Sequence, residues 1–213
     1  MNKILSSFTK IISPPYCIGC ECLLPDYTVL CTACLDRLPA IFSQTISVTV
    51  SKTLTVHALT AYQKPIEKLI LAKLNSNRIP IDQMSFLLSE HVKKHSLDGD
   101  YIVPIPLHWQ RTIWRGFNQA EILAQAVARV LHKPVCKFLK RTKNTVFQSK
   151  LSATERKQNL ENAFKCVISL KDKKIILIDD LYTTGATAVA AARELYKQGA
   201  ASVELLVACK VID

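Results

Sequence analysis

One stretch of the chain, IILIDDLYTTGAT at residues 175–187, combines a buried-strand pattern with polar residues at its end. Four apolar residues run into Asp179 and Asp180, and threonines surround Gly185 a few positions later. The next residues, AVAAARELYKQG, have the composition of a helix that ends at Gly199. Because ligands bind beyond the carboxyl ends of strands in a parallel sheet, this stretch is the expected binding edge.

The residue types in this stretch indicate a sugar phosphate as the ligand. Backbone N–H groups at a helix N-terminus attract anions, a glycine lets the backbone approach closely, and threonine hydroxyls donate to phosphate oxygens. Two carboxylates beside a phosphate site would repel a purely anionic ligand, so we expect Asp179 and Asp180 to face ribose hydroxyls or Mg²⁺. The predicted ligand-binding residues here are Asp179, Asp180, Thr183, Thr184, Gly185, Ala186 and Thr187.

Two other interpretations of the stretch were tested on the sequence. A strand that ends in two acids also resembles a Walker B strand, which requires the loop G-x-x-x-x-G-K-[ST] upstream. The five glycines lie at positions 19, 99, 116, 185 and 199, and their spacing excludes both that loop and G-x-G-x-x-G. A merely structural strand with a capped helix accounts for single Thr and Asp residues but not for the whole run.

The remainder of the chain from residue 46 onward alternates between helical and strand patterns. Amphipathic periodicity predicts helices at 64–74, 80–95, 118–132 and 189–199, and a capping-box spacing predicts another that begins at Ser152. Strands are expected within 43–56 and at 101–107, 173–179 and 202–212. The alternation predicts an α/β domain at 46–213, with a parallel sheet flanked by helices.

Five of the eight cysteines lie between residues 17 and 34. The two C-x-x-C pairs, Cys17 with Cys20 and Cys31 with Cys34, have the spacing of a four-thiolate structural Zn²⁺ site. Disulfides or a redox motif are the alternatives, and Cys22 is a possible competitor for a ligand position. We therefore predict an N-terminal zinc-binding module at 1–45. The remaining three, Cys136, Cys166 and Cys209, are expected in the core.

Basic residues are concentrated in one third of the chain. The net charge is +11, and residues 101–165 alone hold twelve Lys or Arg and three Asp or Glu, a net of +9. This excess is either a solvated basic face or an electrostatic footprint for phosphate. The run KFLKRTKNTVFQSK at 137–150 is either a hood over the binding site or a track for single-stranded DNA. The candidate nucleic-acid contacts are Lys137, Lys140, Arg141, Lys143 and Lys150.

No run of about 20 apolar residues is present, as a membrane-spanning helix would require. The segment at 1–16 is mildly basic and amphipathic, and Lys10 interrupts it before a secretory core forms. We expect a short docking helix there and a cytoplasmic location.

Three further stretches make the chain resemble the ComF family, bacterial proteins linked to competence for DNA uptake. IILIDDLYTTGAT is similar to the phosphoribosyl-diphosphate loop of type I phosphoribosyltransferases, and the cysteine pairs match the family's zinc knuckle. VPIPLHWQRTIWRGFNQAEILA at 103–124 and RTKNTVFQSKLSATERKQNLENAF at 141–164 complete the resemblance. Lys73 matches the lysine of the family's first pyrophosphate loop, although Leu74 replaces the usual aromatic residue and no glycine lies nearby.

The resemblance implies a type I phosphoribosyltransferase fold that binds phosphoribosyl diphosphate with Mg²⁺. Lys73 and His108 would bind the diphosphate, and Arg111 and Arg115 would clamp it as the leaving group beside the acid pair. Two functions remain open, a DNA-uptake factor that binds single-stranded DNA and an active phosphoribosyltransferase with an unidentified acceptor. The resemblance also offers as partners a competence helicase or a membrane DNA-uptake channel, with peripheral contact at the inner membrane as one option.

Overall fold

The computed structural model describes most of the chain and places its elements in order. The described residues are 15–25, 28, 30–38, 42–64, 66–67, 79–95, 97–107, 117–142 and 162–212. The helices among them are α2 (Thr32–Asp36), α4 (Ile79–His95), α6 (Gln119–Leu131) and α8 (Ala186–Lys197). The strands are β1 (Phe42–Ser47), β2 (Thr53–Ala61), β3 (Tyr101–Pro104), β4 (Leu139–Arg141), β5 (Phe164–Cys166), β6 (Lys174–Tyr182) and β7 (Ser202–Lys210).

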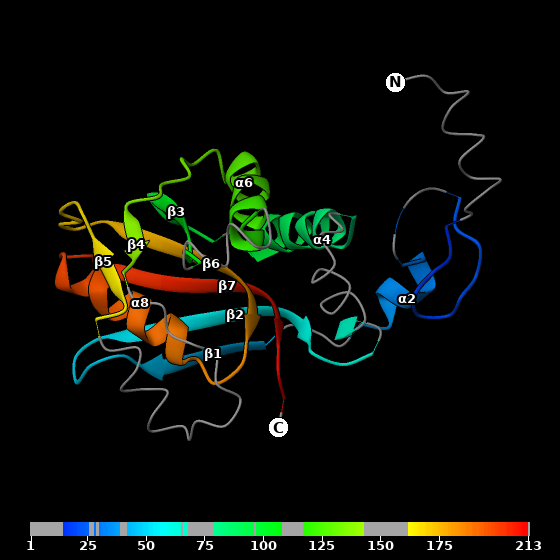
Figure 1. Ribbon diagram of the computed structural model, residues 1–213, viewed down its shortest axis with the longest axis horizontal. Helices are drawn as coiled ribbons and strands as arrows, with labels where there is room; N and C mark the ends of the chain where they lie inside the picture. The colour runs from blue at the N-terminus through cyan, green and yellow to red at the C-terminus, as the bar shows by residue number, and fades with distance from the viewer. Residues whose placement is uncertain are drawn as a thin grey trace.

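The central sheet has the strand order β1-β2-β7-β6-β3 (Figure 1). The pairs β2–β7, β7–β6 and β6–β3 are parallel, and β1 runs antiparallel to β2 at one edge. The predicted α/β fold is therefore confirmed, with one antiparallel strand added at the edge. Because β1 begins at Phe42 and pairs with β2, it spans the predicted module boundary at residues 45–46, which stays a prediction.

The sheet is buried on both faces, which explains the continuous apolar run of β6. Ile176 and Ile178 pack on the side that carries α4 and α6, together with Leu123. Leu177 packs on the opposite side with Leu195 of α8, and the short β4–β5 pair lies on that side as well (Figure 1). Successive residues of a strand point to opposite faces, so a strand covered on both faces needs apolar residues at every position.

Particular residues set the start of α6 and the end of α8. Asn118 caps α6, since its side chain accepts a hydrogen bond from the N–H of Ala120. After α8 the chain reverses at Gly199, whose φ of +95° favours glycine. Gly199 therefore closes the helix as predicted, although α8 ends at Lys197, two residues before the predicted limit, and begins at Ala186, three residues before the predicted start. The extra turn moves the helix N-terminus into the threonine-rich segment.

Some predicted elements lie partly or wholly outside the described residues. The helix predicted at 64–74 is described only at its start. The helix predicted at 152–164 is described only at residues 162–164, and its predicted end is wrong, because Phe164 begins β5. The β4–β5 pair was not predicted, because the sequence analysis treated residues 137–150 as a single basic run. Cys166 and Cys209 are buried as expected, and Cys136 is half-buried.

Residues 15–38, hereafter the cysteine module, lie at the end of the molecule toward which β2 runs (Figure 1). Within the described part of this module, Cys17, Leu24, Leu30 and Cys34 are buried. They belong to the same apolar cluster as the face of the sheet that carries α4 and α6. Among the described residues, no helix has the length and apolar character that crossing a membrane requires.

Candidate phosphate-binding site and cysteine cluster

Asp179 and Asp180 lie near the carboxyl end of β6, where the strand emerges from the core. Residues 175–178 are buried, whereas both aspartates are half-buried. The backbone N–H of Asp180 donates to Oδ1 of Asp179 at 2.9 Å, which fixes the orientation of the first carboxylate. The strand thus delivers two adjacent carboxylates to the edge of the sheet, as the sequence predicted.

Residues 183–187, hereafter the phosphate loop, comprise the connection from this strand to α8 and the first two residues of that helix. Gly185 is the N-cap with a φ of +75°, and its carbonyl accepts from the N–H of Val189 at 2.9 Å. In the described part of the chain, no side chain caps α8 and no acidic residue occupies its first turn. Thr183 and Thr184 are exposed, and Thr187 is half-buried. A helix start with unsatisfied N–H groups and nearby hydroxyls is suited to bind an anion.

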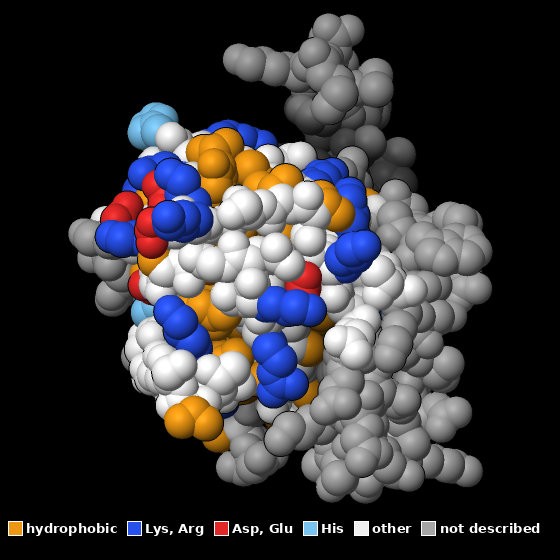
Figure 2. Space-filling model, turned by 90° about the vertical axis from the view of Figure 1, so that its left-hand side faces the viewer, with side chains coloured by type: hydrophobic (Ala, Val, Ile, Leu, Met, Phe, Trp, Pro, Cys, Tyr) orange, Lys and Arg blue, Asp and Glu red, His pale blue; other side chains and the backbone are white. Residues whose placement is uncertain are grey.

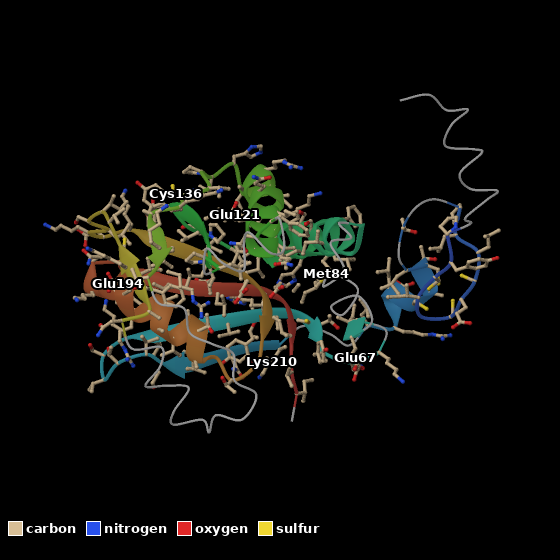
Figure 3. The ribbon with its side chains drawn as sticks, viewed as in Figure 1. Glu67, Met84, Glu121, Cys136, Glu194 and Lys210 are labelled. Atoms are coloured by element: carbon tan, nitrogen blue, oxygen red, sulfur yellow. The ribbon has the colours of Figure 1, made fainter. Side chains whose placement is uncertain are left out.

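The side chain of Tyr182 packs against the phosphate loop. A Cβ placed on Gly185 would lie 2.3 Å from the hydroxyl oxygen of Tyr182, so the loop rests directly on that ring. The Tyr182 hydroxyl accepts from Nε2 of Gln44 at 3.3 Å, and Nζ of Lys210 donates to Oε1 of Gln44 at 2.6 Å. Burial raises the pKa of Tyr182, so its hydroxyl stays protonated. Figure 3 labels Lys210 near the end of β7.

A cavity of about 40 Å³ lies between the loop and the sheet, lined in part by Asp179, Tyr182, Gly185 and Val207. This volume has room for water but not for a sugar phosphate. A sugar phosphate that used this loop would therefore lie on its solvent side, where Thr183 and Thr184 are exposed.

A second connection leaves the sheet at the same edge. The N–H of Ile105, just after β3, donates to the carbonyl of Ile178 on β6 at 2.9 Å. Nδ2 of Asn118 donates back to the Ile105 carbonyl at 3.1 Å, so the start of α6 is held beside the end of β3. Gln119 is only 2% exposed, and its Nε2 has no hydrogen-bond partner among the described residues. The predicted diphosphate ligands Lys73, His108, Arg111 and Arg115 lie outside the described residues.

The cysteine cluster contains three of the four predicted ligands, with Cys22 in the place predicted for Cys34. The Sγ atoms of Cys17, Cys20, Cys22 and Cys31 all lie within 4.8 Å of one another, and those of Cys20 and Cys31 are 3.6 Å apart. Cys34 is not part of that group, but its backbone N–H donates to the Cys31 carbonyl at 3.1 Å. Figure 3 shows the sulfur atoms gathered beside α2.

The donor set fits a tetrahedral metal ion. A Zn–S bond of about 2.3 Å separates two sulfurs of a tetrahedral site by about 3.8 Å, close to the 3.6 Å between the sulfurs of Cys20 and Cys31. Burial opposes ionisation of Cys17, but backbone N–H groups of Cys20, Cys31 and Gly19 outweigh it and lower its pKa to about 6. Hydrogen bonds with its neighbours, first of all the backbone of Cys22, also lower the pKa of Cys20. Thiolates are the species that bind a metal, so the cluster is able to hold an ion.

The candidate nucleic-acid residues differ in their surroundings. Nζ of Lys137 is 2.5 Å from Oε2 of Glu121, so this lysine is already in an ion pair. Lys140 is exposed on β4, and the guanidinium of Arg141 lies 5.6 Å from the ring centroid of Phe164. From the end where β5 lies, Figure 2 shows more basic than acidic side chains on the described surface. Lys143 and Lys150 lie outside the described residues.

The geometry agrees with comparisons to known proteins. The phosphoribosyl transferase domain family matches residues 118–213, which include β6, the phosphate loop and α8. Competence protein F of Haemophilus influenzae is 32% identical over 215 residues, an alignment that covers 96% of this chain and 89% of that protein. DNA utilization protein YhgH of Escherichia coli K12 is 40% identical over 118 residues, which cover 53% of this chain and 50% of the relative. The chain thus spans about half the length of the YhgH relatives that it matches.

Among solved structures, a glutamine phosphoribosylpyrophosphate amidotransferase from B. subtilis aligns with 61% of this chain and 26% of its own. The identity is 15% and the TM-score is 0.44. The near full-length match to competence protein F, together with the phosphoribosyl transferase domain match, shows that this chain belongs to the ComF family. The resemblance predicted from the sequence motifs is therefore confirmed.

Sequence reasoning missed the residues that support the phosphate loop. Tyr182 lies inside the diagnostic stretch, and its position directly after an apolar strand was a usable signal. Gln44 and Lys210 carried none, since they lie 138 and 28 residues from Tyr182 and meet it only through the sheet. Cys22 was noted as a competitor, and the structure places it within the cluster.

Proposed function

We propose that this protein binds phosphoribosyl diphosphate or ribose 5-phosphate on the phosphate loop, and that it serves DNA uptake on the cytoplasmic side of the membrane. The observation that carries this proposal is the start of α8. The helix has Gly185 as its N-cap, without a side-chain cap or an acidic first turn in the described chain, and three threonines surround this glycine. A phosphate group supplies the acceptor that these N–H and hydroxyl donors require.

The acid pair supplies the complementary half of the site. Asp179 and Asp180 accept hydrogen bonds from the ribose diol, and carboxylates are ligands that Mg²⁺ prefers together with substrate phosphates. A bound Mg²⁺ neutralises charge on the diphosphate. Support for a diphosphate clamp by His108, Arg111 and Arg115 is that the connection from β3 to α6 leaves the sheet at the same edge as β6. Lys73 follows β2, which runs parallel to β7 and ends at this edge too.

Titration calorimetry with ribose 5-phosphate and with phosphoribosyl diphosphate plus Mg²⁺ tests the assignment. Asp180→Ala and Thr184→Ala each remove one hydrogen bond to a polar or charged group, worth about 1.5–3 kcal/mol, so we expect affinity to fall by roughly 10- to 150-fold. Asp98→Ala and Thr55→Ala change the same residue types away from the loop and serve as controls. Unchanged affinity in both loop variants contradicts the site.

Single-stranded DNA is the proposed nucleic-acid partner, bound by the basic excess of residues 101–165. Lys140, which is exposed on β4, is the described candidate that leads this proposal, and Arg141 follows it with its guanidinium 5.6 Å from the ring centroid of Phe164. Affinity then falls with salt by about 0.7 log units per log unit for each neutralised phosphate. Charge reversal at Lys140, Arg141 and Lys143 lowers that slope, whereas Lys171→Glu, outside the region, leaves it unchanged. Absent or salt-independent DNA binding removes this part of the proposal.

An active phosphoribosyltransferase is the second candidate function. It is favoured by the acid pair, which lies beside a phosphate loop at an edge shared by β3 and β6. Pyrophosphate release from phosphoribosyl diphosphate, measured with a panel of bases, distinguishes it from a binding protein. Turnover that Asp180→Ala abolishes supports the enzyme, and binding without turnover supports the uptake factor.

For the cysteine cluster we propose zinc as the ion. The support is an all-thiol donor set with tetrahedral spacing in a segment with few buried residues. One zinc per chain in elemental analysis is the expected result, and a metal-free purified protein contradicts it.

A further inference from the structure

The cysteine module offers five thiols to an ion that takes four. Cys17, Cys20, Cys22 and Cys31 form the group whose sulfurs lie within 4.8 Å of one another. Cys34 completes the second C-x-x-C pair, and its backbone N–H donates to the carbonyl of Cys31, a member of this group, at 3.1 Å. Zinc bound by thiolates in structural sites is almost always four-coordinate and tetrahedral. One of the five thiols is therefore left over in any single coordination state.

Four ligands can be chosen in two ways, with either Cys22 or Cys34 as the fourth. The other three thiols are common to both sets, and backbone hydrogen bonds hold them in position. The N–H of Cys31 donates to Sγ of Cys17 at 3.4 Å, and Sγ of Cys20 lies 3.6 Å from Sγ of Cys31. A tight turn holds the first pair, because the N–H of Glu21 donates to the Cys17 carbonyl at 2.8 Å and the N–H of Cys17 donates to the Cys22 carbonyl at 2.9 Å. These bonds set the three sulfurs on one centre without the help of a metal.

The two remaining thiols approach this centre from different environments. Cys22 is exposed and follows Glu21, whose φ of +61° turns the chain back toward the cluster. Cys34 is buried within α2, and its N–H donates to the Cys31 carbonyl at 3.1 Å. One candidate thiol thus faces solvent, and the other is anchored in a helix that packs on the apolar cluster.

We propose that Cys17, Cys20 and Cys31 are permanent ligands of the ion and that Cys22 and Cys34 alternate as the fourth. This inference rests on the zinc occupancy proposed above. The buried set with Cys34 is the closed state, and the set with Cys22 is an open state in which the solvent-exposed thiol holds the metal. Exchange between the two needs only the replacement of one sulfur by another at a centre that already includes Cys22 and that adjoins Cys34 through the backbone of Cys31. The metal can then enter or leave without unfolding of the module.

The experiment compares zinc content and zinc release in single and double variants of the whole protein. Cys22→Ser and Cys34→Ser each keep one complete quartet, so we expect one zinc per chain, with affinity within about 10-fold of the unmodified protein. The double variant keeps three thiolates. Its affinity falls by more than the roughly 100-fold that loss of an outer partner costs, so dialysis against a chelator leaves it without zinc. Cys17→Ser loses zinc in the same way, and Cys136→Ser, outside the cluster, does not.

Release kinetics distinguish the two alternating ligands. Transfer of zinc to a chromogenic chelator slows in Cys22→Ser, which has only the buried set, and accelerates in Cys34→Ser, which has only the exposed set. Amide exchange at residues 174–182 verifies that the sheet is folded in every variant. Loss of zinc from either single variant as complete as in Cys17→Ser overturns the alternation and identifies a fixed fourth ligand. Retention in the double variant, or identical release rates in the two single variants, also overturns it. A purified unmodified protein without zinc contradicts the proposed metal itself.

Discussion

The phosphate loop and the cysteine module hold their functional groups in place by different means. The loop is attached to β6 and α8, and both β6 and its neighbour β7 are buried along most of their length. The described part of the module buries only Cys17, Leu24, Leu30 and Cys34. A site that rests on a large core survives the loss of one ligand side chain but is sensitive to backbone geometry. With the proposed zinc in place, the module should fail when one of the three ligands common to both metal sets is lost.

The largest effect is expected from Cys31→Ser, which removes a ligand common to both metal sets. Structural zinc contributes about 10–16 kcal/mol of apparent binding free energy in small zinc domains, so the module should lose its fold. Hydrogen exchange should show loss of protection at residues 15–38 and unchanged protection at residues 174–182. Cys136→Ser is the matched control. If β6 loses protection as well, the two regions are not independently held.

Leu177→Ala tests whether a defect in the core of the sheet affects the cysteine module. Leu177 is 0% exposed between β7 and α8, and replacement of such a residue costs about 2–5 kcal/mol because it leaves a cavity. Urea unfolding should report that loss, while the zinc content stays unchanged. Val50→Ala, at a fully exposed position, should change stability by less than about 0.5 kcal/mol. Zinc loss in Leu177→Ala would show that the module depends on the core.

Gly185→Ala changes the backbone of the loop rather than a ligand side chain. A residue other than glycine at a φ of +75° is strained by about 1–3 kcal/mol, and the added Cβ would meet the Tyr182 hydroxyl. We expect affinity for ribose 5-phosphate to fall by roughly 5- to 150-fold in calorimetry. Gly199→Ala imposes similar strain at a φ of +95° at the opposite end of α8. It should lower stability without weakening the ligand, and equal affinity losses in both variants would contradict a local effect.

These contrasts also explain which features the sequence predicted. The fold followed from the apolar run of β6 and the amphipathic helices, because burial on both faces of a parallel strand leaves a continuous local pattern. The phosphate loop was predicted because its donors are adjacent in the chain. The Gln44–Tyr182 hydrogen bond joins residues 138 positions apart and leaves no local pattern. The β4–β5 pair was missed because Lys140 and Arg141 conceal a three-residue strand within a basic run.

The sequence analysis gave Cys22 only as a possible competitor for a ligand position, for a related reason. The C-x-x-C spacing identifies pairs of thiols that one turn brings together, and Cys22 lies outside both pairs. Its approach to the cluster depends on the positive φ of Glu21, a conformation that residue type does not indicate. Local spacing therefore predicted a cluster of cysteines in this segment, whereas the place of Cys22 within the cluster required the backbone path.

The smallest effect is expected at Gln44, which stabilises the loop only indirectly, through Tyr182. Its Nε2 donates to the Tyr182 hydroxyl, and Gly185 rests on that hydroxyl, so β1 stabilises the loop without contact with the ligand. Gln44→Ala should cost about 0.5–1.5 kcal/mol of unfolding free energy, the net value of one hydrogen bond, and weaken ribose 5-phosphate by no more than about 3-fold. Tyr182→Phe removes the other partner of the same bond. In a double-mutant cycle the two changes should therefore couple by at least about 0.5 kcal/mol. Additive effects would show that the bond contributes nothing to the loop, and a loss of binding as large as that in Gly185→Ala would place Gln44 in the ligand site itself.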